Sequence, residues 1–122
     1  GEMEEIVAEH PAVAECAVFG INDDLKGEVP LGLVLLKDGT DISEQQLVDE
    51  LKQNVRASIG PIACYNQTLV VKRLPKTRSG KILRRVLRQI AAGEEYSIPS
   101  TIDDPASLAE IEEVMKSSGV VK

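Results

Sequence analysis

Two apolar runs with strand-type composition follow one another near the start of the chain, and they restrict the fold more than any other feature. They occupy residues 13–21 (VAECAVFGI) and 29–37 (VPLGLVLLK). Both are rich in residues that favour β-strands, and a turn or loop signal follows each, at residues 22–24 and 38–39. A third run, residues 68–74 (TLVVKRL), also predicts a strand. The chain should therefore contain a small sheet.

Apolar residues recur at helical spacing in the segments around these strands. Ser43 is expected to cap one helix, with Gln46 completing a capping box three residues later. The order helix, strand, strand, helix, strand, loop, helix, tail, helix predicts an α+β domain in which helices cover a small sheet. A length of 122 residues suits one such domain, residues 1–122. The four predicted helices cover residues 2–10, 43–57, 82–92 and 105–117. Gly60 and Pro61 should break the second helix, Gly93 should cap the end of the third, and residues 94–104 should form an irregular tail.

The charges are distributed unevenly along the chain. The formal net charge is −6, yet residues 72–88 hold eight basic residues and no acidic one, and all 20 acidic residues lie elsewhere. A cationic patch on an acidic body indicates an anionic ligand or an anionic facing surface. Aromatic residues make up only 2% of the chain, so aliphatic side chains must fill the core and base-stacking surfaces are not expected.

Residues 75–81 (PKTRSGK) form a polar, flexible loop between the third predicted strand and the next predicted helix. Lys81 stands at the end of the loop, immediately before that helix. A lysine there can enter a partner's cleft and place a compact charge on phosphate or carboxylate oxygens. The loop is not a Walker A motif, because that motif needs glycine in place of Pro75 and serine or threonine in place of Ile82.

The residues alone leave two other interpretations of this stretch open. One is a solvated basic loop beside an amphipathic helix. The other is a nucleic-acid-binding helix that carries Arg84, Arg85 and Arg88. The acidic remainder of the chain and the scarcity of aromatic residues count against nucleic acid as a partner.

The cysteines, the spacing of possible metal ligands and the hydropathy bear on whether a disulfide, a metal site or a membrane span is expected. Cys16 and Cys64 lie in apolar stretches, which favours two buried thiols in a reducing compartment over a disulfide. One histidine and two cysteines without ligand spacing do not indicate a metal site. No apolar run approaches the roughly 18 residues that span a bilayer, and the acidic start is not a signal peptide, so no membrane partner is expected.

The segment PKTRSGK at residues 75–81 resembles the C-terminal lysine motif of adenylate-forming enzymes, the superfamily of acyl-CoA synthetases, peptide-synthetase adenylation domains and luciferases. The resemblance covers most of residues 2–117 and keeps the family's order. Residues 55–61 are similar to a helix end of short-chain acyl-CoA synthetases, and residues 100–108 are similar to the tail of propionate-activating members. The other matching segments are residues 4–7, 10–11, 13–18 and 24–30.

The resemblance implies the C-terminal domain of an AMP-forming acid–CoA ligase. Such an enzyme activates a short-chain carboxylate, propionate or acetate, with ATP to an acyl-adenylate and then transfers the acyl group to CoA. Lys81 is implied as the catalytic residue, which neutralises charge between the carboxylate and the α-phosphate. Thr77, Ser79 and Gly80 are implied as the loop that supports it. Arg56 is implied as a ligand of the CoA 3′-phosphate, whereas from the residues alone it also fits a cation at a helix end.

The resemblance also implies parts that this chain lacks. A large N-terminal domain of the same enzyme should hold the ATP pocket, the acyl pocket and Mg2+, so the chain alone is expected to be inactive. Lys81 should be reachable for a lysine acetyltransferase and a deacetylase, and acetylation would remove its charge and stop adenylation. The expected location is the cytoplasm, or the mitochondrial matrix in a eukaryote. A stand-alone regulatory or interaction module of the same fold stays open as the alternative.

Overall fold

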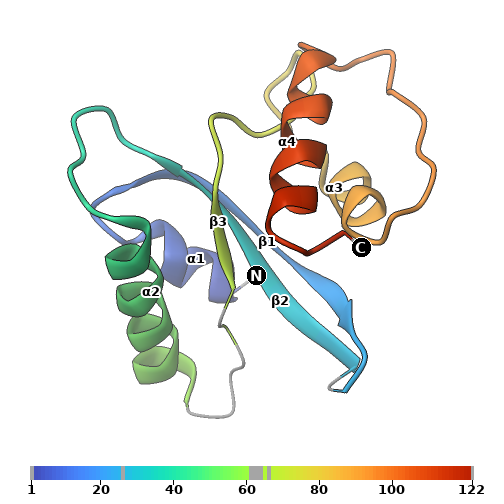
Figure 1. Cartoon of the computed structure of the whole chain (residues 1–122). Helices are drawn as coiled ribbons and strands as arrows, with labels where there is room; N and C mark the ends of the chain where they lie inside the picture. Colours follow the sequence, from blue (N-terminus) through green and yellow to red (C-terminus); the bar gives the residue numbers. More distant parts are fainter. Residues whose placement is uncertain (1, 26, 61–64, 66, 122) are drawn as a thin grey trace. The chain divides into compact units, whose positions relative to one another are not determined.

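The computed structural model describes residues 2–25, 27–60, 65 and 67–121, and its chain divides into two compact units, Gly1–Lys72 and Arg73–Lys122. Figure 1 shows the elements of both units along the chain. Within these described residues, the first unit holds a three-stranded sheet and two helices and the second unit holds two helices, which confirms the predicted α+β class. None of the helices within the described ranges is long and apolar enough to cross a membrane.

The first unit is built on a long antiparallel hairpin, in which β1 (Val13–Asp23) pairs with β2 (Gly27–Leu36). The third strand, β3 (Thr68–Val70), runs parallel to β2, and the order in the sheet is β1-β2-β3. The first two predicted strands are confirmed. The third was predicted too long, at residues 68–74, because only the first residues of that run pair with β2. Beyond Val71, whose N–H still donates to the carbonyl of Val34, the backbone leaves the sheet.

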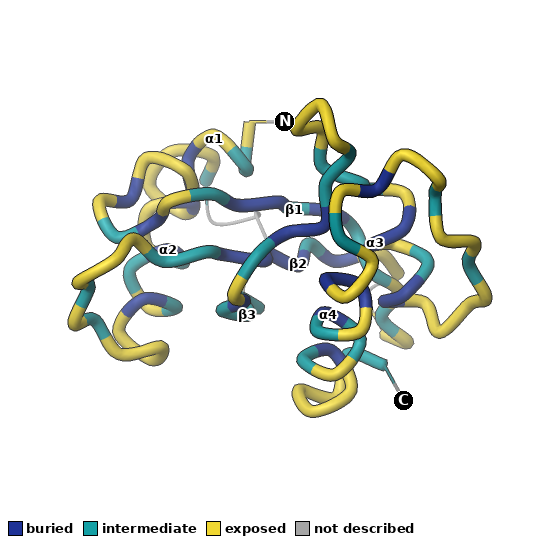
Figure 2. The backbone as a smooth tube through the Cα atoms, turned by 90° about the horizontal axis from the view of Figure 1, so that it is seen from above, coloured by how far each residue is buried: buried dark blue, intermediate teal, exposed yellow. Residues whose placement is uncertain are grey.

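Two helices pack on one face of this sheet, and they correspond to the two helices predicted for this part of the chain. They are α1 (Glu2–Ala8) and α2 (Glu44–Ile59). Figure 2 shows buried positions recurring along β1 and β2. The core between the helices and the sheet consists mainly of aliphatic side chains, as the low aromatic content predicts: Ile6, Val7, Val13, Cys16, Val34, Leu47, Leu51, Val55 and Tyr65.

The start and the end of α2 are set by local backbone chemistry. Ser43 caps the helix, because its Oγ accepts the N–H of Gln46 at 3.1 Å. The capping box is only half formed, since the Gln46 side chain donates forward to Glu50 instead of back to the cap. At the other end Gly60 has a φ of +122° and its N–H donates to the carbonyl of Arg56, so the predicted helix stop is confirmed there. Pro61 lies outside the described residues.

The second unit contains α3 (Arg84–Ala91) and α4 (Ala106–Ser117), which contact each other. Gly93 ends α3 with a φ of +72°, and the N–H groups of Gly93 and Glu94 donate to the carbonyls of Ile90 and Gln89. This is the Schellman arrangement that glycine favours after a helix. The buried apolar side chains of the two helices are Val86, Leu87, Ile90 and Ala91 on α3 and Leu108, Ile111 and Met115 on α4.

The predicted start of α3 at residue 82 is wrong by two residues. Ile82 forms an antiparallel bridge with Lys76, and the N–H of Leu83 donates to the carbonyl of Pro75. Leu83 therefore has a non-helical ψ of 70° and stands before the first helical residue, Arg84. The apolar spacing of Ile82 and Leu83 fits a helix, but their backbone groups are already used by the preceding loop.

Candidate functional site

The segment 75–82 folds back on itself as a hydrogen-bonded loop. Above the Lys76–Ile82 bridge, the N–H of Thr77 donates to the carbonyl of Lys81 at 2.8 Å. The N–H of Gly80 donates to the carbonyl of Thr77 at 2.9 Å, which closes the turn. Gly80 has a φ of +93°, a conformation that glycine adopts at little cost and other residues avoid. The segment predicted as a polar, flexible loop is thus a hydrogen-bonded turn.

Side-chain hydroxyls reinforce this turn. Thr77 Oγ1 accepts the N–H of Lys81 at 3.1 Å and lies 2.9 Å from Ser79 Oγ. Thr77 is half-buried, whereas Ser79, Gly80 and Lys81 are exposed. The prediction that Lys81 stands immediately before the helix needs correction. The lysine lies on the returning arm of the loop, and α3 begins only at Arg84.

The tail after α3 pairs with the outgoing arm of the loop. Ile102 forms an antiparallel bridge with Thr77 and is only 5% exposed. On either side of this bridge, the N–H of Arg78 donates to the carbonyl of Thr101, and the N–H of Asp103 donates to the carbonyl of Lys76, both at 2.9 Å. The sequence predicted only an irregular tail here. The pairing places the outgoing arm of residues 75–82, the lysine loop, between the tail and the returning arm at Ile82.

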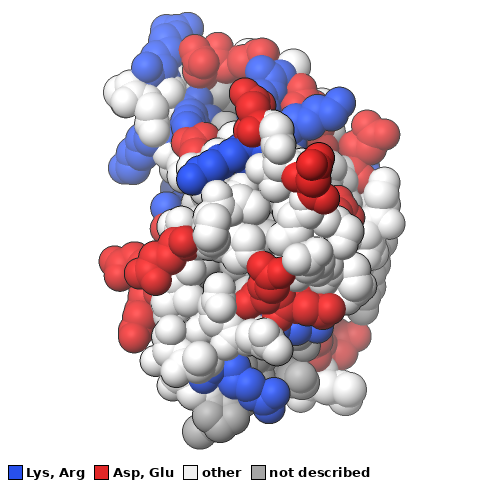
Figure 3. All heavy atoms as spheres, turned by 90° about the vertical axis from the view of Figure 1, so that its left-hand side faces the viewer, with Lys and Arg blue, Asp and Glu red and all other residues white. Residues whose placement is uncertain are grey.

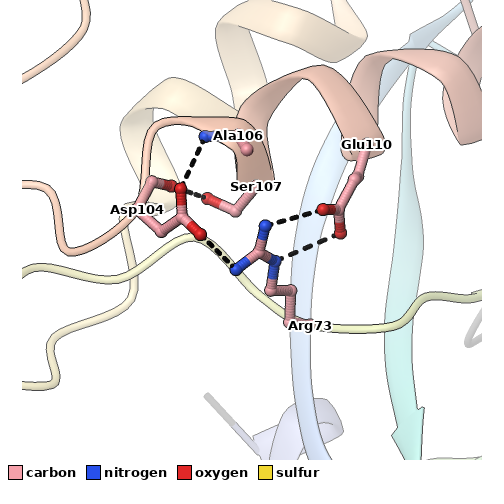
Figure 4. A network of polar contacts seen from close by, with 5 residues as sticks. All are labelled: Arg73, Asp104, Ala106, Ser107 and Glu110. Atoms are coloured by element: carbon pink, nitrogen blue, oxygen red, sulfur yellow. Dashed lines mark hydrogen bonds and ion pairs between the residues drawn. The ribbon is translucent and has the colours of Figure 1, made fainter.

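An ion cluster joins the base of the loop to the end of the tail (Figure 4). Arg73 Nη1 lies 2.6 Å from Asp104 Oδ2, and its Nη2 and Nε donate to the two carboxylate oxygens of Glu110 at 2.6 and 3.1 Å. Asp104 Oδ1 also accepts the N–H of Ala106 at 3.0 Å. The Arg73 guanidinium, together with this N–H, holds the pKa of the Asp104 carboxyl below its usual range. Glu110 and Asp104 in turn raise the pKa of Arg73.

Sequence reasoning missed this cluster. Its members are separated by 31 and 37 positions, and no local spacing connects an arginine in a strand-like run to two carboxylates so far along the chain. The one available signal was that Arg73 and Lys72 open the basic stretch directly before the apolar pair Leu74 and Pro75.

Arg56 lies in the other unit, exposed in the last turn of α2. Its carbonyl accepts the N–H of Gly60, so the backbone of Arg56 takes part in the helix end. A cation in this turn is favoured by the helix dipole, which is the alternative explanation of the residue. The structure describes Arg56 and Lys81 in separate units, and the role of each residue remains a prediction.

The other residues considered from the sequence occupy ordinary positions. Cys16 is buried, with its Sγ 3.5 Å from the carbonyl oxygen of Glu4, and Cys64 lies outside the described residues. Arg85 and Arg88 are exposed on α3, and Arg84 is half-buried. The face drawn in Figure 3 carries both acidic and basic side chains. Within the described ranges, no group of three or more His, Cys, Asp or Glu side chains is arranged to hold a metal ion.

Comparison with known proteins gives a consistent result. The family profile "AMP-binding enzyme C-terminal domain" matches residues 2–81, about two thirds of the chain. An uncharacterised protein of Pseudomonas aeruginosa is 64% identical over 116 residues, 95% of this chain and 18% of that protein. The mouse protein "Acyl-CoA synthetase short-chain family member 3, mitochondrial" is 48% identical over 95% of this chain and 17% of its own length.

A solved structure shows the same fold over nearly the whole chain. The acetoacetyl-CoA synthetase of Streptomyces lividans superposes with a TM-score of 0.78, covering 96% of this chain and 18% of that one, at 22% identity. The chain thus spans less than a fifth of the length of the curated relatives it matches. The family profile match ends at Lys81, the last residue of the lysine motif. The chain therefore belongs to the family of C-terminal domains of AMP-binding enzymes.

Proposed function

We propose that residues 1–122 form the lysine-donating domain of an AMP-forming acyl-CoA ligase that acts on a short-chain carboxylate, propionate or acetate. One observation carries the proposal. The chain belongs to a family of AMP-binding enzymes, and its only long basic stretch presents the exposed Lys81 on a loop whose backbone is paired on both sides. The name of the mouse relative, a short-chain acyl-CoA synthetase, supports the class of substrate.

In the first half-reaction, the carboxylate attacks the α-phosphate of ATP, and acyl-adenylate and pyrophosphate form. Negative charge gathers between the incoming carboxylate oxygen and the phosphoryl oxygens. Lys81 supplies a compact positive charge at that point, so its contribution is electrostatic stabilisation and positioning. Because the ammonium acts as a charge, Lys81 is neither base nor nucleophile. Thr77, Ser79 and Gly80 hold the turn from which the side chain extends.

In the second half-reaction, the thiol of CoA displaces AMP and the acyl group becomes a thioester. Lys81 has no role in this step, for which the domain turns another face toward the active site. Arg56 binds the 3′-phosphate of CoA there, since its planar fork meets phosphate oxygens at two points. ATP and CoA are the substrates of the complete enzyme. A large N-terminal domain is the partner that supplies their pockets.

Mg2+ belongs to that large domain in this proposal. The described residues of this chain do not fit a metal site, because no three Asp, Glu, His or Cys side chains among them are grouped so that they could hold a metal ion. No step assigned to Lys81 or Arg56 passes through a metal ion. The cytoplasmic location stays a prediction, and the name of the mouse relative places that protein in mitochondria.

The test of the proposed activity uses the full-length enzyme that contains this chain. Exchange of labelled pyrophosphate into ATP should depend on propionate or acetate, and added CoA should yield the corresponding thioester and AMP. The 122-residue chain alone should catalyse neither reaction, because the proposal assigns the nucleotide and acyl pockets to the large N-terminal domain. Absence of carboxylate-dependent exchange in the full-length enzyme would contradict the assignment as a ligase. It would leave a regulatory or interaction module as the better explanation.

We further propose that acetylation of Lys81 controls the enzyme. The side chain is exposed at the end of its loop, so a lysine acetyltransferase can reach it, and acetylation removes the charge that adenylation needs. After treatment with such a transferase, loss of adenylation should follow the modified fraction of Lys81 measured by mass spectrometry. A deacetylase should restore both together. Inactive enzyme with Lys81 unmodified, or with the mark only at the nearby Lys76, would contradict this control.

A further inference from the structure

The structure links Arg73 to the lysine loop through the tail. Arg73 stands two residues before Pro75, where the loop begins, and Asp104 directly follows the tail residues that pair with the loop. We propose that Arg73 is a positioning residue. By binding Asp104 and Glu110, it holds residues 101–103 beside the loop and thereby keeps Lys81 in the position that adenylation requires. This inference rests on the proposed role of Lys81.

The contacts form a continuous path from Arg73 to Lys81. Arg73 binds Asp104, and the residue before Asp104 donates its N–H to the carbonyl of Lys76. Ile102 is bridged to Thr77, and Thr77 contacts Lys81 twice, through its backbone N–H and through Oγ1. Every step is a hydrogen bond or a β-bridge within the unit Arg73–Lys122.

The geometry of the Arg73 cluster indicates that the guanidinium orients its two carboxylate partners and does not only attract them. The guanidinium of Arg73 lies between two carboxylates, binding Glu110 at two points and Asp104 at a third, as Figure 4 shows. A planar fork that meets partners at fixed angles sets orientation as well as distance. Asp104 also fixes the start of α4, since its Oδ1 accepts the N–H of Ala106 and its carbonyl accepts the hydroxyl of Ser107. Arg73 thus holds the tail at the point where the tail becomes a helix.

The main alternative is a small contribution to overall stability. The Arg73 side chain is 39% exposed and those of Asp104 and Glu110 are 47% and 41% exposed. Exposed ion pairs of this kind add little to stability. The position of the tail along the loop is a different matter. Three residues of backbone pairing specify it weakly by themselves, so side chains must fix it, namely the buried Ile102 and the pair of Arg73 with Asp104. The two explanations differ in what removal of Arg73 does to each half-reaction.

A double-mutant cycle in the full-length enzyme separates them. Arg73→Gln, Lys81→Ala and the double variant are compared with the wild type by pyrophosphate exchange, and thioester formation is measured from supplied acyl-adenylate. Arg73→Gln should lower the adenylation rate roughly tenfold or more, with the KM for ATP little changed, because a misplacement of about 1 Å costs up to about 100-fold. In the Lys81→Ala background the same substitution should change the rate by less than about twofold, since its effect passes through Lys81.

Three controls accompany the cycle. Arg88→Ala removes an exposed arginine from α3 and should leave adenylation unchanged. Arg73→Lys keeps the charge but loses the fork, so its adenylation rate should lie between those of the wild type and Arg73→Gln. Intact thioester formation shows that a variant is folded. If Arg73→Gln loses that reaction as well, Asp104→Asn takes its place in the cycle, because it weakens the ion pair and keeps an oxygen for Ala106.

The outcomes distinguish the inference from the proposed function. If Lys81→Ala lowers adenylation and Arg73→Gln does not, Arg73 is not a positioning residue and the proposed function stands. The inference also fails if the two substitutions are additive, or if Arg73→Gln and Asp104→Asn lower both half-reactions equally, since either result shows a general structural role. If Lys81→Ala leaves adenylation unchanged, the role of Lys81 falls and the inference falls with it.

Discussion

Replacement of Lys81 by alanine in the full-length enzyme should lower the rate of acyl-adenylate formation by about 100-fold or more. The size follows from the loss of one preorganised charge at a transition state, which commonly costs about 100- to 1000-fold. The reason lies in the loop, since the turn at Gly80 and the pairing with Thr77 fix the backbone from which the lysine side chain extends. Pyrophosphate exchange measures the effect. Thioester formation from supplied acyl-adenylate should continue at nearly the wild-type rate.

Arg78→Ala is the matched control for this experiment. Arg78 is exposed in the same loop and carries the same charge, and only its backbone N–H takes part in the pairing with Thr101. Its removal tests whether adenylation needs a positive loop in general or a charge at one position. Adenylation should fall far less in Arg78→Ala than in Lys81→Ala. Equal losses in the two variants, or equal loss of both half-reactions in Lys81→Ala, would remove Lys81 from its proposed role.

The sequence was informative wherever local chemistry decides the structure. The cap at Ser43, the helix stop at Gly60 and the glycine after α3 each depend on a few neighbouring residues, and all three were predicted correctly. The two strands of the hairpin were predicted for the same reason, because composition and turn residues lie within one short stretch. Residues 75–81 also marked the candidate site directly, since the resemblance rests on contiguous residues.

Long-range pairing explains what the sequence did not predict. The tail appeared irregular because residues 101–103 pair with a loop more than 20 positions earlier, and no local pattern indicates that partner. The start of α3 moved from residue 82 to Arg84 for a different reason, because Ile82 is bridged to Lys76 within the loop. His10 is a further case. Its side chain is buried, and its Nε2 lies 2.7 Å from Oε1 of Glu50, forty positions away. The sequence predicted only that a helix ends at His10.

Arg56→Ala should raise the KM for CoA of the full-length enzyme by about 10- to 150-fold, equivalent to roughly 1.5–3 kcal/mol for a lost charge-assisted contact. Arg56 is exposed in the last turn of α2, so its guanidinium is accessible to a phosphate. Adenylation, measured by pyrophosphate exchange, should hardly change, since CoA takes no part in that step. Lys52→Ala is the control for charge on the same helix one turn earlier, and it should raise the KM for CoA much less.

Dephospho-CoA makes the comparison specific to the proposed partner, because it lacks only the 3′-phosphate. The wild type should prefer CoA over dephospho-CoA by about the factor that Arg56→Ala loses, and the variant should treat the two thiols almost alike. A helix-end cation predicts something else. In that case Arg56→Ala would lose up to about 1 kcal/mol of stability through the helix dipole and would keep the wild-type preference for CoA. The retained preference would remove Arg56 from the CoA site, and the proposed role of Lys81 would be unaffected because it concerns the other half-reaction.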